Sequence, residues 1–225
     1  MAIAVAFDDP SAESDLAVYR AQFHLPPCTT ANGCFRKINQ DGGTTPPPNA
    51  DPGWALETAL DTDAVSAACP DCHILLVEAD NGMSVNLLTA VDQARLQGAK
   101  YISMSWGAPE FPAETIFDQL YFNHPGIAYV AGTGDTGYPN LIWPGASRFV
   151  TAVGGTVLNR ERPEEEPHSD PSRRRRGWTE TGVGRRHCRP CVALRPCPPP
   201  LQRPGPREGC SWRRPPGSVS AVLRN

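Results

Sequence analysis

The first 159 residues alternate short apolar runs with segments of helical periodicity. The apolar runs predict strands over residues 2–7, 73–79, 101–105, 127–131 and 149–153. The periodic segments predict helices over residues 11–23, 54–68, 84–97 and 113–123, with Ser11 as the cap of the first. Residues 33–52 are rich in Gly, Pro and Asn and read as a loop. Strands alternating with helices predict an α/β fold with a doubly wound, mostly parallel sheet, whose functional site lies beyond the carboxyl ends of the strands.

Charge and composition change abruptly near residue 160. Residues 1–159 hold 6 Lys and Arg against 17 Asp and Glu, whereas residues 160–225 hold 15 Arg, no Lys and 7 Asp and Glu. The second part also contains 12 of the 25 prolines and no Phe, Tyr, Ile or Met. So few large apolar side chains do not offset the ordering entropy of a packed core. We therefore expect a globular domain over 1–159 and an irregular, disordered Arg/Pro-rich tail over 160–225.

Four cysteines of the domain fall into two local pairs, Cys28 with Cys34 and Cys69 with Cys72. Close pairs flanked by turn residues favour disulfides, and disulfides favour an exported, secreted protein. The N-terminus shows no signal peptide, since residues 1–7 are too short for one and read as a strand. We therefore expect upstream sequence to be missing. No apolar run is long enough to cross a membrane.

Glu57 and Asp61 lie four residues apart on a predicted helix, so both carboxylates project from one face. Two carboxylates at this separation can divide proton handling, one as a base and the other as its support. A glutamate base operates in acid, where histidine is protonated. The same spacing is also common on solvated helix faces.

Two later segments supply candidate partners for this pair. Asp135, after Gly134 in a Gly-rich turn, can donate a hydrogen bond to an oxyanion while it is protonated. Residues 103–107 follow a predicted strand and can pair with an extended peptide by strand addition. Taken singly, each feature is better explained by an ordinary turn, packing or a solvated helix face, and only their joint order favours a catalytic site.

The order of these segments resembles the sedolisin family, serine-carboxyl peptidases related in fold to subtilisins. Residues 57–61 match its E-x-x-L-D element, residues 103–107 its S-x-S-[WY]-G strand, and residues 134–137 its G-D-[ST]-G turn. Residues 143–147 and 153–156 match W-P-A-S and V-G-G-T. The resemblance covers about residues 1–158. It implies a subtilisin-like fold and endopeptidase activity on unfolded proteins or peptides at low pH.

By this resemblance Glu57 is the base, Asp61 its partner and Asp135 the oxyanion acid. The substrate-binding candidates are Ser103, Ser105, Trp106, Gly107 and Gly134. The resemblance also implies secretion, and we expect a monomer.

The sequence departs from the family after Thr181. The family nucleophile lies in a downstream G-T-S-x-x-x-P element, which is absent, and neither Ser211 nor Ser218 has those surroundings. The calcium site of the family and its long pro-segment are also missing, so we expect no cofactor or metal in this chain. Residues 177–181 still resemble the family, and a reading frame lost after Thr181 would account for the Arg/Pro-rich tail. We therefore expect a truncated, inactive peptidase.

Other readings remain open. One is a noncatalytic protein that binds peptides along the 103–107 strand edge. Another is nucleic-acid binding through the Arg clusters, which would be nonspecific because no aromatic platform accompanies them. The irregularly spaced tail cysteines are better explained by chance than by zinc, and Cys69 to Cys72 by a structural disulfide than by a redox C-x-x-C.

Overall fold

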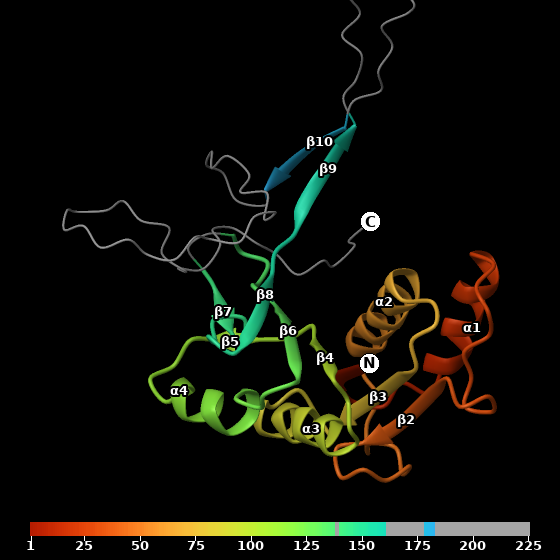
Figure 1. Ribbon diagram of the computed structural model, residues 1–225, viewed down its shortest axis with the longest axis horizontal. Helices are drawn as coiled ribbons and strands as arrows, with labels where there is room; N and C mark the ends of the chain where they lie inside the picture. Colours follow the sequence, from red (N-terminus) through yellow and green to blue (C-terminus); the bar gives the residue numbers. More distant parts are fainter. Residues whose placement is uncertain (138–139, 161–177, 183–225) are drawn as a thin grey trace, which may run out of the picture.

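The computed structural model describes residues 1–137, 140–160 and 178–182. Its centre is a six-stranded sheet in which every neighbouring pair of strands is parallel (Figure 1). The order across the sheet is β2 (Phe35–Asn39), β3 (Ile74–Ala79), β1 (Ala2–Ala6), β4 (Tyr101–Met104), β6 (Ala128–Gly132) and β8 (Val150–Val153). The predicted parallel α/β sheet is confirmed.

Helices cover both faces of this sheet (Figure 1). The helices are α1 (Ala12–Gln22), α2 (Pro52–Ala68), α3 (Ser84–Leu96) and α4 (Glu114–Phe117), and α4 continues as a π-helical segment, η1 (Asp118–Phe122). Helices α1 and α2 pack together on one face, and α3 packs against the centre of the other. The fold is therefore doubly wound, as the sequence predicts.

Strand β1 shows why an uninterrupted apolar run forms the centre. Ala2, Ala4 and Ala6 belong to the core on the α3 face, while Ile3 and Val5 belong to the core beneath α1 and α2. Because successive side chains of a strand point to opposite faces, a strand covered on both faces must be apolar at every position. The small alanines leave room for α3 to lie close to the sheet.

Strand β2 lies within residues 33–52, where the sequence predicts only a loop. Phe35 and Ile38 are buried, and β2 pairs with β3 from Phe35↔Ile74 to Asn39↔Glu78. The prediction is wrong here because pairing with a distant strand forms β2. Its own sequence has no regular alternation, since charged residues separate its two buried positions.

Two local predictions are also corrected. Ser11 stands at the N-cap of α1 but does not cap it, because its hydroxyl donates to the carboxylates of Asp9 and Asp15. The helix predicted over residues 113–123 is divided between α4 and η1, and its first residue is Glu114.

Both predicted disulfides, Cys28–Cys34 and Cys69–Cys72, are confirmed. Beside them, the buried guanidinium of Arg20 ties three segments together. It donates to the carbonyls of Pro26 and Pro70 at 2.6 and 2.8 Å and to the hydroxyl of Ser66 at 3.0 Å. None of these acceptors is a carboxylate, so their charge does not change with pH.

Regular structure continues past residue 159, where the sequence places the domain boundary. Strand β9 (Thr156–Arg160) pairs antiparallel with β10 (Trp178–Gly182). A second small sheet joins β5 (Ala108–Pro109) to β7 (Ile142–Trp143). The predictions about the rest of the tail, including its Arg clusters, cysteines and serines, lie outside the described residues.

Candidate active site

Helix α2 carries both carboxylates of the predicted pair. The helix begins where the Asp51 side chain accepts two free backbone N–H groups of the first turn, at 2.9 and 3.0 Å, with Pro52 in the first turn. Glu57 follows about one and a half turns later and Asp61 about two and a half turns later, and both are half-buried. Both carboxylates therefore lie on a partly buried face of α2 and not on a fully solvated one.

Asp61 meets the end of β4 through Ser105. The Ser105 hydroxyl donates to Oδ1 of Asp61 at 2.6 Å, across 44 positions of sequence. The other oxygen, Oδ2, is shielded from solvent and has no hydrogen-bond partner among the described residues. The structure thus brings together two of the residues that the sequence singles out, one from a helix and one from beyond a strand.

Burial is the main influence on the acidity of Asp61. It raises the pKa of Asp61 to about 7, because removal of solvent disfavours the charged form. The hydrogen bond from Ser105 acts in the opposite direction, and the neighbouring charge of Glu57 raises the pKa further. The two carboxylates therefore interact electrostatically, and Asp61 retains its proton throughout the acid range.

Asp135 lies just after β6, the strand next to β4, so it follows the same carboxyl edge of the sheet as Ser105. Its side chain is exposed. The preceding Gly134 has a φ of 97°, a conformation that side chains other than glycine rarely adopt. The proposed roles of Asp135 and Gly134 stay predictions.

The predicted strand edge at residues 103–107 is only partly free. Ser103 pairs with Ile3 of β1 on one side and with Val130 of β6 on the other, so it lies inside the sheet. The prediction that a peptide adds to the main chain at Ser103 is therefore wrong, because neighbouring strands already occupy both sides of β4 at this residue. The segment available for such pairing begins after β4, at Ser105.

Trp106 and Gly107 hold this segment against the core. The Trp106 indole is buried and donates to the carbonyl of Ala4 at 3.0 Å. A Cβ on Gly107 would lie 2.5 Å from the Ile142 side chain and 2.7 Å from the Trp143 carbonyl oxygen. The Trp106 ring therefore packs inside the protein, and Gly107 permits the close approach of β7.

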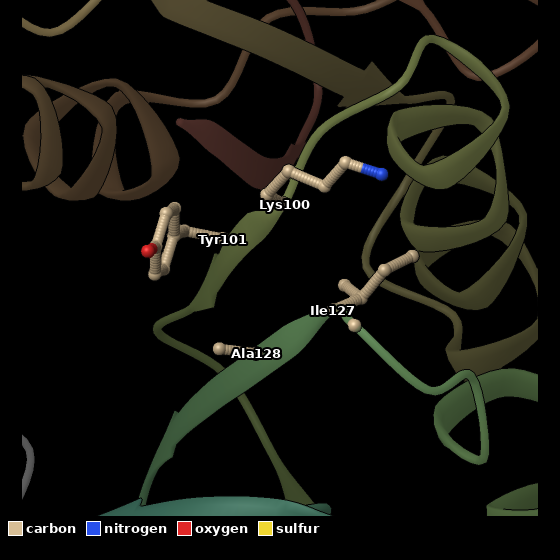
Figure 2. A pocket seen from close by; sticks show the side chains of 5 residues that line it. Lys100, Tyr101, Ile127 and Ala128 are labelled. Atoms are coloured by element: carbon tan, nitrogen blue, oxygen red, sulfur yellow. The ribbon is translucent and has the colours of Figure 1, made fainter.

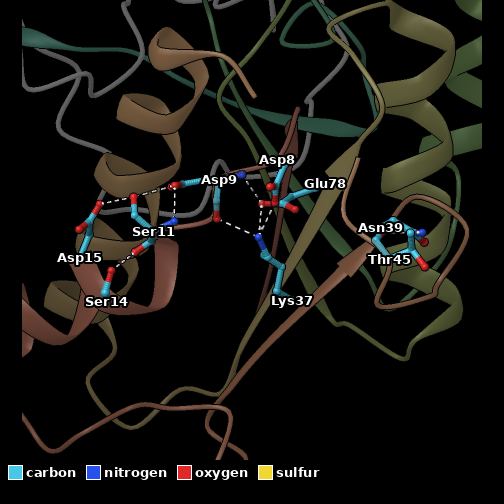
Figure 3. Close-up of polar contacts among 9 residues, drawn as sticks. All are labelled: Asp8, Asp9, Ser11, Ser14, Asp15, Lys37, Asn39, Thr45 and Glu78. Carbon is cyan, nitrogen blue, oxygen red and sulfur yellow. Dashed lines mark hydrogen bonds and ion pairs between the residues drawn. The ribbon is translucent and has the colours of Figure 1, made fainter. Parts of the chain in front are cut away.

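A second polar cluster joins strands β2 and β3 to the residues that follow β1 (Figure 3). The Lys37 ammonium lies 2.6 Å from Oδ1 of Asp8 and 3.4 Å from Oε1 of Glu78, and it donates to the Asp9 carbonyl at 2.8 Å. The same Glu78 oxygen accepts the backbone N–H of Asp9 at 2.9 Å. One cation thus bridges two carboxylates contributed by different strand ends.

The two charges of this cluster that lie within strands are affected differently by burial. Burial raises the pKa of Glu78 to about 7, although the Asp9 N–H and the Lys37 ammonium favour its charged form. Burial would lower the pKa of Lys37, but its contacts with Asp8 and Glu78 outweigh this and raise it. This cluster is not among the sites that the sequence predicts. Its available signal was Glu78 itself, an acidic residue inside a buried strand, which requires a partner.

The described surface also carries a shallow hollow away from the two polar clusters. This open hollow is lined by Lys100, Tyr101, Gly126, Ile127 and Ala128 at the beginnings of β4 and β6, opposite the edge that carries Ser105. Figure 2 shows the Lys100 and Tyr101 side chains pointing to different sides. The described residues include no cluster of three His, Cys, Asp or Glu arranged to hold a metal ion. Within the same residues, no helix has the length and apolarity to cross a membrane.

Comparison with known proteins gives similarity at the level of structure. No family model and no curated protein matches the sequence. The solved structures that resemble the fold include subtilisin-like proteases. A lanthipeptide protease matches with a TM-score of 0.47 and 16% identity, over 68% of this chain and 47% of its own. The protease domain of PatA matches with a TM-score of 0.45 and 19% identity, over 68% and 56% respectively.

A third such structure is the psychrophilic subtilisin-like protease Apa1 from Pseudoalteromonas sp. AS-11. It matches with a TM-score of 0.42 and 16% identity, over 68% of this chain and 35% of its own. The chain thus spans about half the length of the first of these structures and about a third of Apa1.

Proposed function

We propose that this chain is an incomplete acid endopeptidase of the sedolisin type, with Glu57 as its general base. The observation that carries the proposal is the hydrogen bond from the Ser105 hydroxyl to Asp61, a shielded carboxyl on which the charge of Glu57 also acts. A carboxylate pair of this kind suits proton transfer in acid. Asp135, at the same edge of the sheet, is proposed as the oxyanion acid.

The chemistry divides between the two carboxylates. At acid pH the buried Asp61 is protonated, because its pKa is raised to about 7. Its negative charge then no longer opposes that of Glu57. Glu57 can accept the proton of an attacking serine hydroxyl, and the acid form of Asp135 can donate a hydrogen bond to the oxyanion that develops. This use of carboxylic acids restricts the reaction to low pH.

We also propose that the chain lacks the nucleophile and does not hydrolyse peptides. No G-T-S element occurs in the sequence, so a base without its serine should give only residual acceleration. The substrates of the intact site would be unfolded proteins or peptides. The two disulfides support an exported protein.

Digestion of casein or haemoglobin at about pH 3–4 tests the proposal. We expect the full chain and its Glu57→Gln variant to show the same background rate. Turnover by the full chain that the Glu57→Gln variant loses would confirm the base and contradict the missing nucleophile.

The nucleotide sequence after codon 181 provides the second test. An out-of-frame G-T-S element there would explain the absence of the serine. If the reading frame is intact and no alternative frame encodes such an element, the hypothesis of a lost reading frame is wrong.

A second candidate function is binding of an extended peptide without cleavage. It is favoured by one observation, namely that the backbone after β4 leaves the sheet at Ser105 while Trp106 is anchored to Ala4. Binding of an unstructured peptide that is recovered intact at acid pH would support this function, and cleavage of the peptide would contradict it. The Arg-rich tail, the basis of the nucleic-acid alternative, lies outside the described residues.

A further inference from the structure

Ser105 faces the protein's own carboxylate pair. Its hydroxyl donates to Oδ1 of Asp61 at 2.6 Å, the usual separation for a hydroxyl that donates to a carboxylate. The residue is fixed on both sides along the chain, because Met104 belongs to β4 and Trp106 is tied to Ala4. The hydroxyl is therefore held in place by the sheet, and Asp61 is held in turn.

The contact distinguishes the two oxygens of Asp61. Oδ1 accepts the serine hydroxyl, whereas Oδ2 is shielded from solvent and has no such partner within the described part of the chain. A proton taken up by Asp61 is then best accommodated on Oδ2, because Oδ1 already accepts a hydrogen atom. A carboxylic acid can donate only from the oxygen that carries the proton. The serine thus determines which side of Asp61 acts as a donor.

We propose that Ser105 is a positioning residue that orients Asp61 and directs its acid proton to Oδ2, and is not a substrate contact. This inference rests on the proposed function, since it assigns a role within the same carboxylate site. It replaces the reading of Ser105 as a substrate-binding side chain with one in which the serine acts through Asp61 on the Glu57 base.

An NMR titration of the side-chain carboxyl groups in the full chain tests this role. The signal of Asp61 is assigned by its loss in Asp61→Asn. In Ser105→Ala, the pKa of Asp61 should rise by about one pH unit, because the charged form loses a hydrogen-bond donor. Ser105→Thr keeps the hydroxyl and should restore the wild-type value.

A matched control is Ser103→Ala, two residues earlier and inside β4, which should leave the pKa of Asp61 unchanged. If Ser105→Ala does not fold, Ser105→Cys replaces it, because cysteine is similar in size and donates weakly. The proposal is overturned if the pKa of Asp61 stays constant or falls on loss of the hydroxyl, or if threonine fails to restore it. None of these measurements needs turnover, so failure of the peptidase proposal and failure of the positioning role are distinguishable.

Discussion

Replacing Glu78 by glutamine should make the protein more stable at neutral pH. Glu78 is only 1% exposed, and its pKa is raised from 4.5 to about 7. The folded state therefore keeps a proton that the unfolded state releases between these two values. The stability that this proton provides is complete below about pH 4.5 and is lost as the pH rises through 7.

The magnitude follows from the same two values. Each pH unit by which a pKa moves is worth about 1.4 kcal/mol, so Glu78 alone makes the fold about 3 kcal/mol less stable at pH 8 than in acid. Glutamine mimics the protonated side chain, because its Oε1 can still accept the Asp9 N–H and face Lys37. The Glu78→Gln variant should therefore match the wild type near pH 4.5 and exceed its free energy of unfolding by about 3 kcal/mol at pH 8.

Urea unfolding of the full chain, followed by tryptophan fluorescence at several pH values between 4.5 and 8, measures this difference. Asp41→Asn, at an exposed turn, is the matched control and should follow the wild-type curve. Burial also raises the pKa of Asp61 to about 7, so the variant should retain part of the pH dependence. Parallel wild-type and Glu78→Gln curves across this range would refute the reasoning.

Two further substitutions test contacts that do not depend on pH. Arg20→Lys should lower the free energy of unfolding by about 2 kcal/mol, because lysine cannot reach all three acceptors of the guanidinium. The loss should be the same at pH 4.5 and pH 8, because none of these acceptors is a carboxylate. A loss that differs between the two pH values would contradict this. Gly107→Ala should cost about 1–3 kcal/mol through overlap with Ile142 and Trp143. Gly43→Ala, where an added Cβ meets atoms no closer than 3.5 Å, is its control, and equal losses in the two variants would show that the overlap is relieved.

Features that depend on neighbouring residues could be predicted from the sequence. The apolar run at residues 2–6 gives a strand that is buried on both faces. Successive side chains of a strand point to opposite faces, so a run that is apolar at every position has two apolar faces. The spacing of Glu57 and Asp61 gives one helix face for the same kind of reason. Both disulfides follow from cysteines only six and three residues apart. In each case the partners are fixed by short stretches of backbone geometry.

The contacts that give the site its chemistry depend on packing between distant segments. Strand β2 forms because β3 pairs with it, and only that pairing brings Lys37 to Glu78. Ser105 reaches Asp61 across 44 positions, through the placement of β4 beside β1 and beneath α2. Sequence periodicity reports which face of an element is apolar, but it does not report which elements meet. The sequence therefore determined the α/β fold and the candidate carboxylates. The tertiary structure decided which carboxylates are desolvated, because removal of water depends on the neighbours that cover them.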